Sequence, residues 1–212
     1  LTEDDIIEHC QERIKKVCAA TINQDVGYLH GALKYVKAAR RDCKDIKPSV
    51  ITYVRPFLVK NGYIGKSNPR TRLPTDEEIA RLLARAAEPP RKKHRDFIYA
   101  MPDIIAFALV SARRIGEICS ITHADVGWDH LDDKGQPAPI YWVRNMKHPT
   151  KKKGNDMAFT LFPELAEIIK RQPRKPGDDR IFPFNDKSVG AKYTLFKNEL
   201  GILDLHFHDN RG

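Results

Sequence analysis

The sequence predicts a mainly helical protein with a small antiparallel β-sheet, an α+β fold. Apolar residues recur at helical spacing through the first 64 residues, and two short strand-like runs follow at 140–143 and 157–161. Of the 212 residues, 41% are hydrophobic and 31% are charged, which is typical of a globular chain with a sizeable core. We therefore expect helices to dominate and the sheet to be confined to the second half.

Residues 1–64 are expected to form a helical domain. Thr2 and Asp5 have the spacing of a capping box, and an apolar stripe at helical spacing follows them. A second stripe over 22–36 alternates steps of four and three, which predicts a helix-packing face. A third apolar segment follows Pro48 and also has helical spacing.

Residues 65–74 interrupt this periodicity with Gly, Ser, Asn and two prolines, which predicts a linker. Its cations are candidates for contacts with a nucleic-acid backbone: Lys66, Arg70 and Arg72. A capping box at Thr75 and Glu78 then opens a second domain, expected to span 75–212. Further helices are expected in this domain at 102–109, 164–171 and 188–200.

The charge balance favours a polyanionic partner. Lys and Arg number 37 against 28 acidic residues, a formal net charge of +9. Each cation that meets a phosphate releases condensed counterions, so such a surplus is typical of DNA-binding proteins. No apolar run approaches the roughly 18 residues that a membrane helix needs, and the acidic start lacks a signal pattern. We therefore expect a cytoplasmic protein.

A first motif spans residues 111–117, with the sequence Ser-Ala-Arg-Arg-Ile-Gly-Glu. Small residues allow a close backbone turn, after which Arg114 can point into a cleft while apolar residues anchor a helix. Glu117 follows three residues later on the same face, where its carboxylate can fix the guanidinium. Asp125 lies shortly beyond. Alone, this pattern also fits a surface Arg–Glu pair on an amphipathic helix.

Two further motifs carry cations and imidazoles. Lys147 lies in the polar stretch between the strand-like runs, followed by Lys151, Lys152 and Lys153, which would contact phosphates or solvate a turn. Near the end of the sequence, His208 and Arg211 are three residues apart, so on an opening helix they would face one phosphate together. His206 and His208 could suggest a metal pair, but no further ligands with suitable spacing exist, so we expect no metal site.

In this order, the three motifs resemble the signature boxes of the tyrosine recombinases, in particular the phage-derived integrases of bacterial genomes. The pattern departs where Asn210 replaces the usual Leu and Gly212 follows the arginine. The resemblance implies a partial helical core-binding domain at 1–64 and an incomplete catalytic domain at 75–212. It also implies a bacterial, nucleoid-associated protein that acts on double-stranded DNA without a metal or other cofactor.

The resemblance also implies a role for each site residue. Arg114 and Arg211 would clamp the scissile phosphate, with Glu117 in support. Lys147 would donate a proton to the leaving 5′ oxygen. His208 would hydrogen-bond the phosphate or help to deprotonate the nucleophile. The activity implied is site-specific integration or excision of phage or mobile DNA through a 3′-phosphotyrosine intermediate.

In this family the nucleophilic tyrosine follows the second arginine box. The seven tyrosines of this sequence all precede His208, and Tyr193, the nearest, lies on the apolar stripe of a predicted helix. We therefore expect a C-terminally truncated chain that binds DNA as a monomer without cleaving it. The resemblance implies a tetramer on DNA for the full-length enzyme.

Three other functions fit parts of the sequence. A non-catalytic regulatory protein derived from an integrase would bind DNA but would not require the ordered set of Arg, Lys, His and Arg. A type IB topoisomerase shares the chemistry, but the linker-joined helical domain favours recombination. A metal-dependent nuclease needs clustered carboxylates, whereas Asp129, Asp132 and Asp133 lie in a turn-rich segment.

Overall fold

The computed structural model of this chain describes residues 1–88, 100–147 and 154–210. The chain divides into two compact units, Leu1–Arg70 and Thr71–Gly212. The division falls within the segment 65–74 that the sequence predicts as a linker. The predicted architecture, mainly helical with a small antiparallel sheet, is confirmed.

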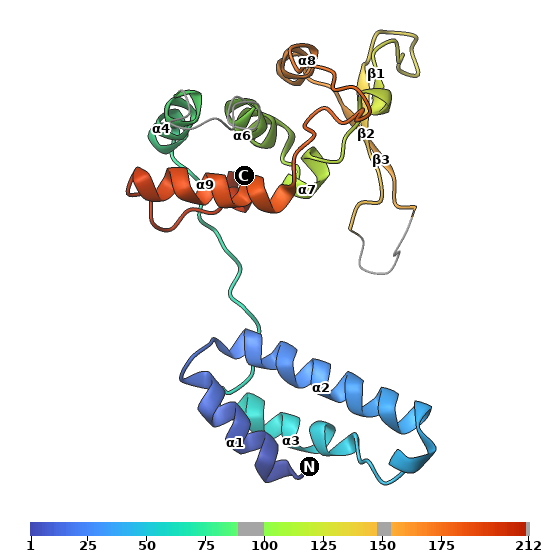
Figure 1. The fold of residues 1–212 in the computed structure, drawn as a ribbon, viewed down its shortest axis with the longest axis vertical. Coiled ribbons are helices and arrows are strands. Elements are labelled where there is room, and N and C mark those ends of the chain that lie inside the picture. The colour runs from blue at the N-terminus through green and yellow to red at the C-terminus, as the bar shows by residue number, and fades with distance from the viewer. Residues whose placement is uncertain (89–99, 148–153, 211–212) are drawn as a thin grey trace. The chain divides into compact units, whose positions relative to one another are not determined.

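The first unit is helical throughout its regular structure. In it, α1 (Glu3–Ile14) packs against α2 (Ala19–Ala39) and α3 (Ser49–Lys60), and a 3-10 turn, η1 (Arg41–Cys43), follows α2 (Figure 1). The predicted capping box is present, because the Asp5 N–H donates to Thr2 Oγ1 at 3.2 Å and the Thr2 N–H donates to Asp5 Oδ2 at 2.7 Å. The buried core of the unit comprises Ile6, Cys10, Ile22, Val26, Ile51, Val54, Leu58 and Ile64.

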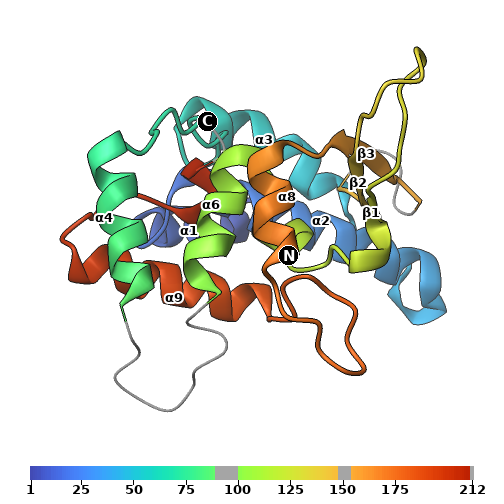
Figure 2. The ribbon, with the colours of Figure 1, turned by 90° about the horizontal axis from the view of Figure 1, so that it is seen from above.

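The second unit is built around the helix α6 (Met101–Ser111), which lies between α4 (Asp76–Ala87) and α8 (Pro163–Lys170) (Figure 2). The helix α9 (Asp186–Glu199) packs against α4. Six of the eleven residues of α6 are buried, which is typical of a helix enclosed on several sides. The helices predicted around 102–109, 164–171 and 188–200 are thus confirmed, with bounds that differ by at most two residues.

Within the described residues, the sheet has three antiparallel strands in the order β1–β2–β3: β1 (Val126–Gly127), β2 (Ile140–Val143) and β3 (Met157–Thr160). Tyr141 pairs with Phe159 across β2 and β3, and Val126 pairs with Tyr141 across β1 and β2. The sequence predicts β2 and β3, but β1 has only two residues and no alternating run that could identify it. The stretch between β2 and β3 therefore joins neighbouring strands, as predicted.

Aromatic packing holds α6 against the sheet. The Phe107 ring meets the ring of Tyr141 on β2 nearly edge to face, with 5.9 Å between centroids, and meets Phe182 in the same way at 5.8 Å. All three side chains are buried. The C-terminal end of α6, where the first motif begins, is thereby held in place relative to β2.

Among the described helices, none combines the length and the apolar character that crossing a bilayer requires.

Candidate functional site

The first motif begins at a strained turn. The helix α6 ends at Ser111, and Ala112 adopts the left-handed conformation (φ 54°, ψ 28°) while its N–H donates to Ala108 O at 2.9 Å. For a residue other than glycine, this region costs about 1–2 kcal/mol, and such strain is concentrated at functional sites. The turn ends α6 directly before the two arginines of the motif.

The two arginines of the motif have different partners. The Arg113 guanidinium lies 4.0 Å from the centroid of the Phe159 ring on β3, and its Nε donates to Ser111 O at 2.9 Å. Arg114 instead caps α7 (Ile115–Ile118): its N–H donates to Glu117 Oε2 at 3.0 Å and its Nη1 donates to Glu117 Oε1 at 2.8 Å. Arg114 is therefore the arginine whose guanidinium is oriented by the carboxylate three residues later, as the spacing predicts.

The side chains of Arg114 and Glu117 differ in how deeply they are buried. The Arg114 side chain is 41% exposed, whereas that of Glu117 is only 10% exposed. A carboxylate held out of solvent is a firm anchor, and a guanidinium has five N–H donors, so the exposed part of Arg114 retains donors for an anion. The helix that begins here is short: α7 ends at Ile118, and Ile121 is buried beyond the end of the helix.

Lys147 is exposed on the polar stretch that leaves β2. The base of this hairpin is held by local hydrogen bonds. The Met146 N–H donates to Asn155 O at 2.8 Å, and the Gly154 N–H donates to Asn145 Oδ1 at 2.9 Å. Asn145 itself has a positive φ of 50°, which Asn tolerates better than most residues. The predicted phosphate contacts Lys151, Lys152 and Lys153 lie outside the described residues.

An ion-pair network at the hairpin base was not predicted from the sequence. Arg144 Nε donates to Asp125 Oδ1 at 2.8 Å, and Arg144 Nη1 lies 3.3 Å from Asp156 Oδ2. Burial alone would raise the pKa of Asp125, but hydrogen bonds from Thr122 and Arg144 outweigh it and lower the pKa. Asp125 is therefore ionised at neutral pH and available as a charged anchor. The one feature of the sequence that could have pointed to this network is the position of Arg144 directly after a predicted strand.

His208 lies in a 3-10 helix, η3 (Phe207–Asn210), rather than at the start of the α-helix that we expected. The His206 N–H donates to Asp209 Oδ2 at 2.8 Å and fixes the start of this turn. His208 is exposed. Arg211, its predicted companion, lies outside the described residues, so the expectation that both face one phosphate stays a prediction.

Asn210, where the sequence departs from the family pattern, has a hydrogen-bond partner in the core. Asn210 is only 2% exposed, and the hydroxyl of the buried Tyr193 on α9 donates to its Oδ1 at 3.1 Å. The Tyr193 ring also packs on Phe207 nearly edge to face, with 5.2 Å between centroids. Burial raises the pKa of Tyr193 to about 12. A polar pair between α9 and η3 thus occupies the place where the family pattern has an apolar side chain.

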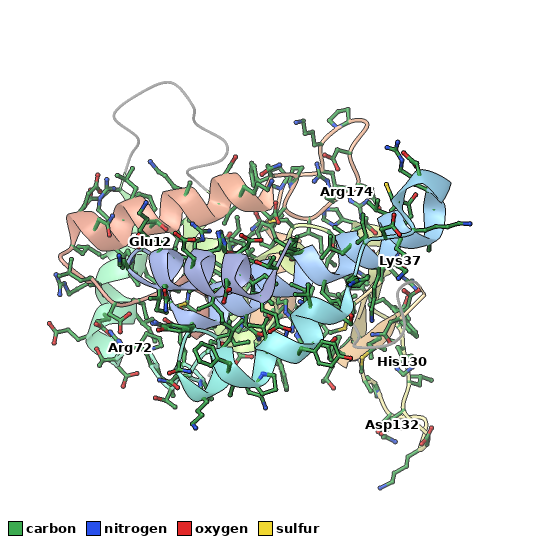
Figure 3. The ribbon with its side chains drawn as sticks, turned by 90° about the horizontal axis from the view of Figure 1, so that it is seen from below. Glu12, Lys37, Arg72, His130, Asp132 and Arg174 are labelled. Atoms are coloured by element: carbon green, nitrogen blue, oxygen red, sulfur yellow. The ribbon has the colours of Figure 1, made fainter. Side chains whose placement is uncertain are left out.

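The predicted linker cations have different environments. Lys66 and Arg70 are exposed. Arg72 is half-buried, and its guanidinium contacts Glu78 Oε1 at 2.5 Å, the Asp204 carbonyl at 3.1 Å and the Leu73 carbonyl. Arg72 belongs to the second unit and is labelled in Figure 3. These contacts of Arg72 are all within the protein, and a DNA contact from any of the three cations stays a prediction.

The segments that carry Arg114 and His208 share neighbours. Both α7 and η3 pack against α6 and α9. Lys147 comes from the sheet, which is held to α6 through Phe107. The convergence of Arg114, Lys147, His208 and Arg211 on one phosphate-sized pocket remains a prediction.

Within the described ranges, no group of three or more His, Cys, Asp or Glu side chains could hold a metal ion. A cavity of about 520 Å³ lies beside the start of α6, and its lining includes Asp103, Arg171 and Arg174 but none of the predicted site residues. The connection between β1 and β2 projects from the sheet and carries His130 and Asp132 (Figure 3). The Asp132 carboxylate accepts hydrogen bonds from its own loop at Lys134 and Gln136.

No protein-family model matches this chain, and no curated protein matches it in sequence. Solved structures do match it. A lambda integrase tetramer bound to a Holliday junction matches with a TM-score of 0.65 and 17% identity, over 100% of this chain and 57% of that one. A Tn1549 transposon integrase in complex with a circular intermediate DNA matches with a TM-score of 0.61 and 13% identity, over 99% and 70%.

The XerH site-specific recombinase bound to its difH substrate matches with a TM-score of 0.57 and 15% identity, over 100% of this chain and 58% of that one. These proteins are tyrosine recombinases, and the chain has their fold. It spans 57% and 55% of the length of two of the lambda integrase chains.

Proposed function

We propose that this chain takes part in site-specific DNA recombination as a segment of a tyrosine recombinase of the integrase type. The single observation that carries the proposal is the state of Arg114. Its guanidinium is oriented by the buried Glu117 carboxylate yet is still partly exposed, in a fold shared with integrases that were solved on DNA. The net charge of +9 supports double-stranded DNA as the partner.

The chemistry proposed for the complete site needs no metal. A tyrosine oxygen attacks the scissile phosphorus, and the bond to the 5′ oxygen breaks, which leaves a 3′-phosphotyrosine and a 5′ hydroxyl. Arg114 and Arg211 offer N–H donors to the non-bridging oxygens and neutralise charge that develops in the transition state. Lys147 gives its proton to the leaving oxygen, and His208 hydrogen-bonds the phosphate or helps to take the phenolic proton from the attacking tyrosine.

We further propose that residues 1–212 alone bind DNA without cleaving it, which also suits a non-catalytic regulator derived from an integrase. The observation that favours this concerns Tyr193, the tyrosine nearest to the second arginine box. Its hydroxyl is buried and bonded to Asn210, and its raised pKa opposes formation of a phenolate. We expect a monomer in the absence of DNA and, for the full-length enzyme, a tetramer on DNA.

Binding of a mixed-sequence duplex at several salt concentrations tests the proposal. If the chain contacts Z phosphates, the logarithm of the association constant should fall with the logarithm of salt concentration with a slope of about −0.9Z. Arg114→Gln should weaken binding, whereas Arg171→Gln should not, since Arg171 is paired with Asp103 away from the predicted site residues. A flat salt response would exclude phosphate contacts.

A second assay tests the absence of cleavage. Incubation with nicked or gapped duplexes, followed by denaturing electrophoresis, should reveal no covalent protein–DNA adduct. An adduct that forms with this chain and is lost in Tyr193→Phe would refute the proposed role of Tyr193 as a core residue.

A further inference from the structure

Arg144 connects two segments that are far apart in sequence. It directly follows β2, and its guanidinium reaches Asp125 Oδ1 at 2.8 Å and Asp156 Oδ2 at 3.3 Å. The guanidinium also lies 4.9 Å from the centroid of the Trp142 ring. Since Asp156 directly precedes β3, the pair with Asp156 closes the base of the hairpin from one strand to the other.

The pair with Asp125 ties that base to the first motif. Asp125 is 8% exposed, and its second oxygen accepts from the Thr122 N–H at 3.0 Å and from Thr122 Oγ1 at 2.6 Å. It ends the 3-10 turn η2 (His123–Asp125), which follows α7 and Arg114 in the chain. Asp125 is thus a rigid, charged point on the segment that carries Arg114, and Arg144 is bonded to it.

The second carboxylate orients the backbone next to Lys147. Asp156 Oδ1 accepts from the Asn145 N–H at 2.8 Å, and Asn145 lies two residues before Lys147. Both charged partners of Arg144 therefore act on the hairpin base, one through the backbone of Asn145 and one through the segment of Arg114. Arg144 is paired with two carboxylates, whereas Arg114 is paired with one, so the positive charge of Arg144 is largely neutralised within the protein.

We propose that Arg144 is a positioning residue that fixes the Lys147 ammonium relative to Arg114. The inference rests on the proposed function, in which the ammonium must reach the leaving oxygen of the phosphate that Arg114 holds. Proton transfer requires a separation of about 2.6–3.2 Å between heavy atoms, and a misplacement of about 1 Å can cost a hundredfold in rate. The hydrogen bonds from Met146 and Gly154 join the two arms of the hairpin base to each other, whereas the pair of Arg144 with Asp125 joins the base to the segment that carries Arg114.

Amide hydrogen exchange on the 212-residue protein without DNA tests the anchoring. Arg144→Gln should speed exchange about tenfold at the hairpin-base amides, which a charge-assisted network protects, and should leave α6 and α9 unchanged. Arg144→Lys has one ammonium and cannot span both carboxylates, so it should restore only part of the protection. In the Asp125→Asn background, Arg144→Gln should add less than it does alone, because the two residues share one contact.

Arg171→Gln is the matched control. The side chains of Arg171 and Asp103 are 55% and 16% exposed, close to the side-chain values of 46% and 11% for Arg144 and Asp125. It joins α8 to α6, and we expect it to leave the hairpin-base amides unaffected. Equal acceleration in both variants, or exchange in Arg144→Gln within twofold of the unmodified protein, would overturn the anchoring.

A second readout concerns Lys147 itself and is one that a loss of stability would not move. Lysines are acylated with a succinimidyl ester in the presence and absence of duplex DNA, and modification is measured by peptide mass spectrometry. DNA should protect Lys147 in the unmodified protein. In Arg144→Gln, affinity for DNA should stay within about threefold, as for a cation already paired internally, while the protection of Lys147 is lost.

The two readouts separate the possible failures. Protection of Lys147 that is unchanged in Arg144→Gln would refute the positioning role even if DNA binds. If the unmodified protein does not bind DNA, the proposed function fails, while the exchange data still decide whether Arg144 anchors the hairpin.

Discussion

Replacing Tyr193 by Phe should destabilise the second unit through a single buried hydrogen bond. The Tyr193 hydroxyl donates to Asn210 Oδ1 at 3.1 Å, and the residues are 1% and 2% exposed. Asn210 Nδ2 has no partner among the described residues, so the substitution would leave the whole amide without a partner there. An unsatisfied buried acceptor costs about 1–3 kcal/mol, so we expect a loss near 2 kcal/mol.

The apolar double variant provides the control. Asn210→Leu alone should also destabilise, because the Tyr193 hydroxyl would lose its acceptor. Combining it with Tyr193→Phe removes both polar groups, which is often close to neutral, so the double variant should recover most of the loss. For a unit of this size, about 2 kcal/mol corresponds to a fall in Tm of roughly 4–8 °C.

Urea denaturation followed by circular dichroism, with thermal scans in parallel, measures both effects. A change below about 0.5 kcal/mol in Tyr193→Phe, of the size of ordinary surface substitutions, would show that the hydrogen bond does not hold η3 to α9. Additive losses in the double variant would show that the two residues do not act as a pair.

Three further outcomes can be measured on the same protein. Thr75→Ala removes the N-cap of α4 and should lower the free energy of unfolding of the second unit by about 1 kcal/mol in urea titrations. The Arg180 side chain lowers the pKa of Asp178 from 3.8 to about 2. The Asp178 carboxylate therefore stabilises the folded state above pH 3.8, and this contribution is lost as the pH falls toward 2. In Asp178→Asn, the midpoint of unfolding should vary less between these pH values. Burial raises the pKa of Cys119 to about 12, so iodoacetamide at pH 8 should alkylate the exposed Cys18 first, and rapid labelling of Cys119 would contradict its burial.

The features that the sequence predicts well depend on residues close together in the chain. The capping box at Thr75 and the contact between Arg114 and Glu117 each need only three residues of spacing, and both are present. The strand at 140–143 was identified from its apolar and aromatic run and has the same bounds in the structure. Short-range sequence patterns therefore predicted most of the helices and strands, and they predicted the orientation of one site residue, Arg114.

The features that the sequence missed depend on partners distant in the chain. Arg144 is identified as an anchor only when Asp125, 19 residues earlier, is known to lie beside it. From the sequence, Arg72 is a linker cation available to DNA, yet in the structure it donates a hydrogen bond to the Asp204 carbonyl 132 residues later. Asn210 reads as a departure from a pattern until Tyr193 is seen to face it. Spacing along the chain contains no information on such pairings.

One carboxylate performs two tasks at the start of α7. Glu117 uses Oε2 to accept the Arg114 backbone N–H and Oε1 to accept its guanidinium. A glutamine would place an NH2 group, which donates and cannot accept, where one of these two oxygens lies, and an aspartate is one methylene shorter. Selection for the local fold and selection for the arginine's orientation therefore fall on the same side chain, so drift at this position cannot relax one without changing the other.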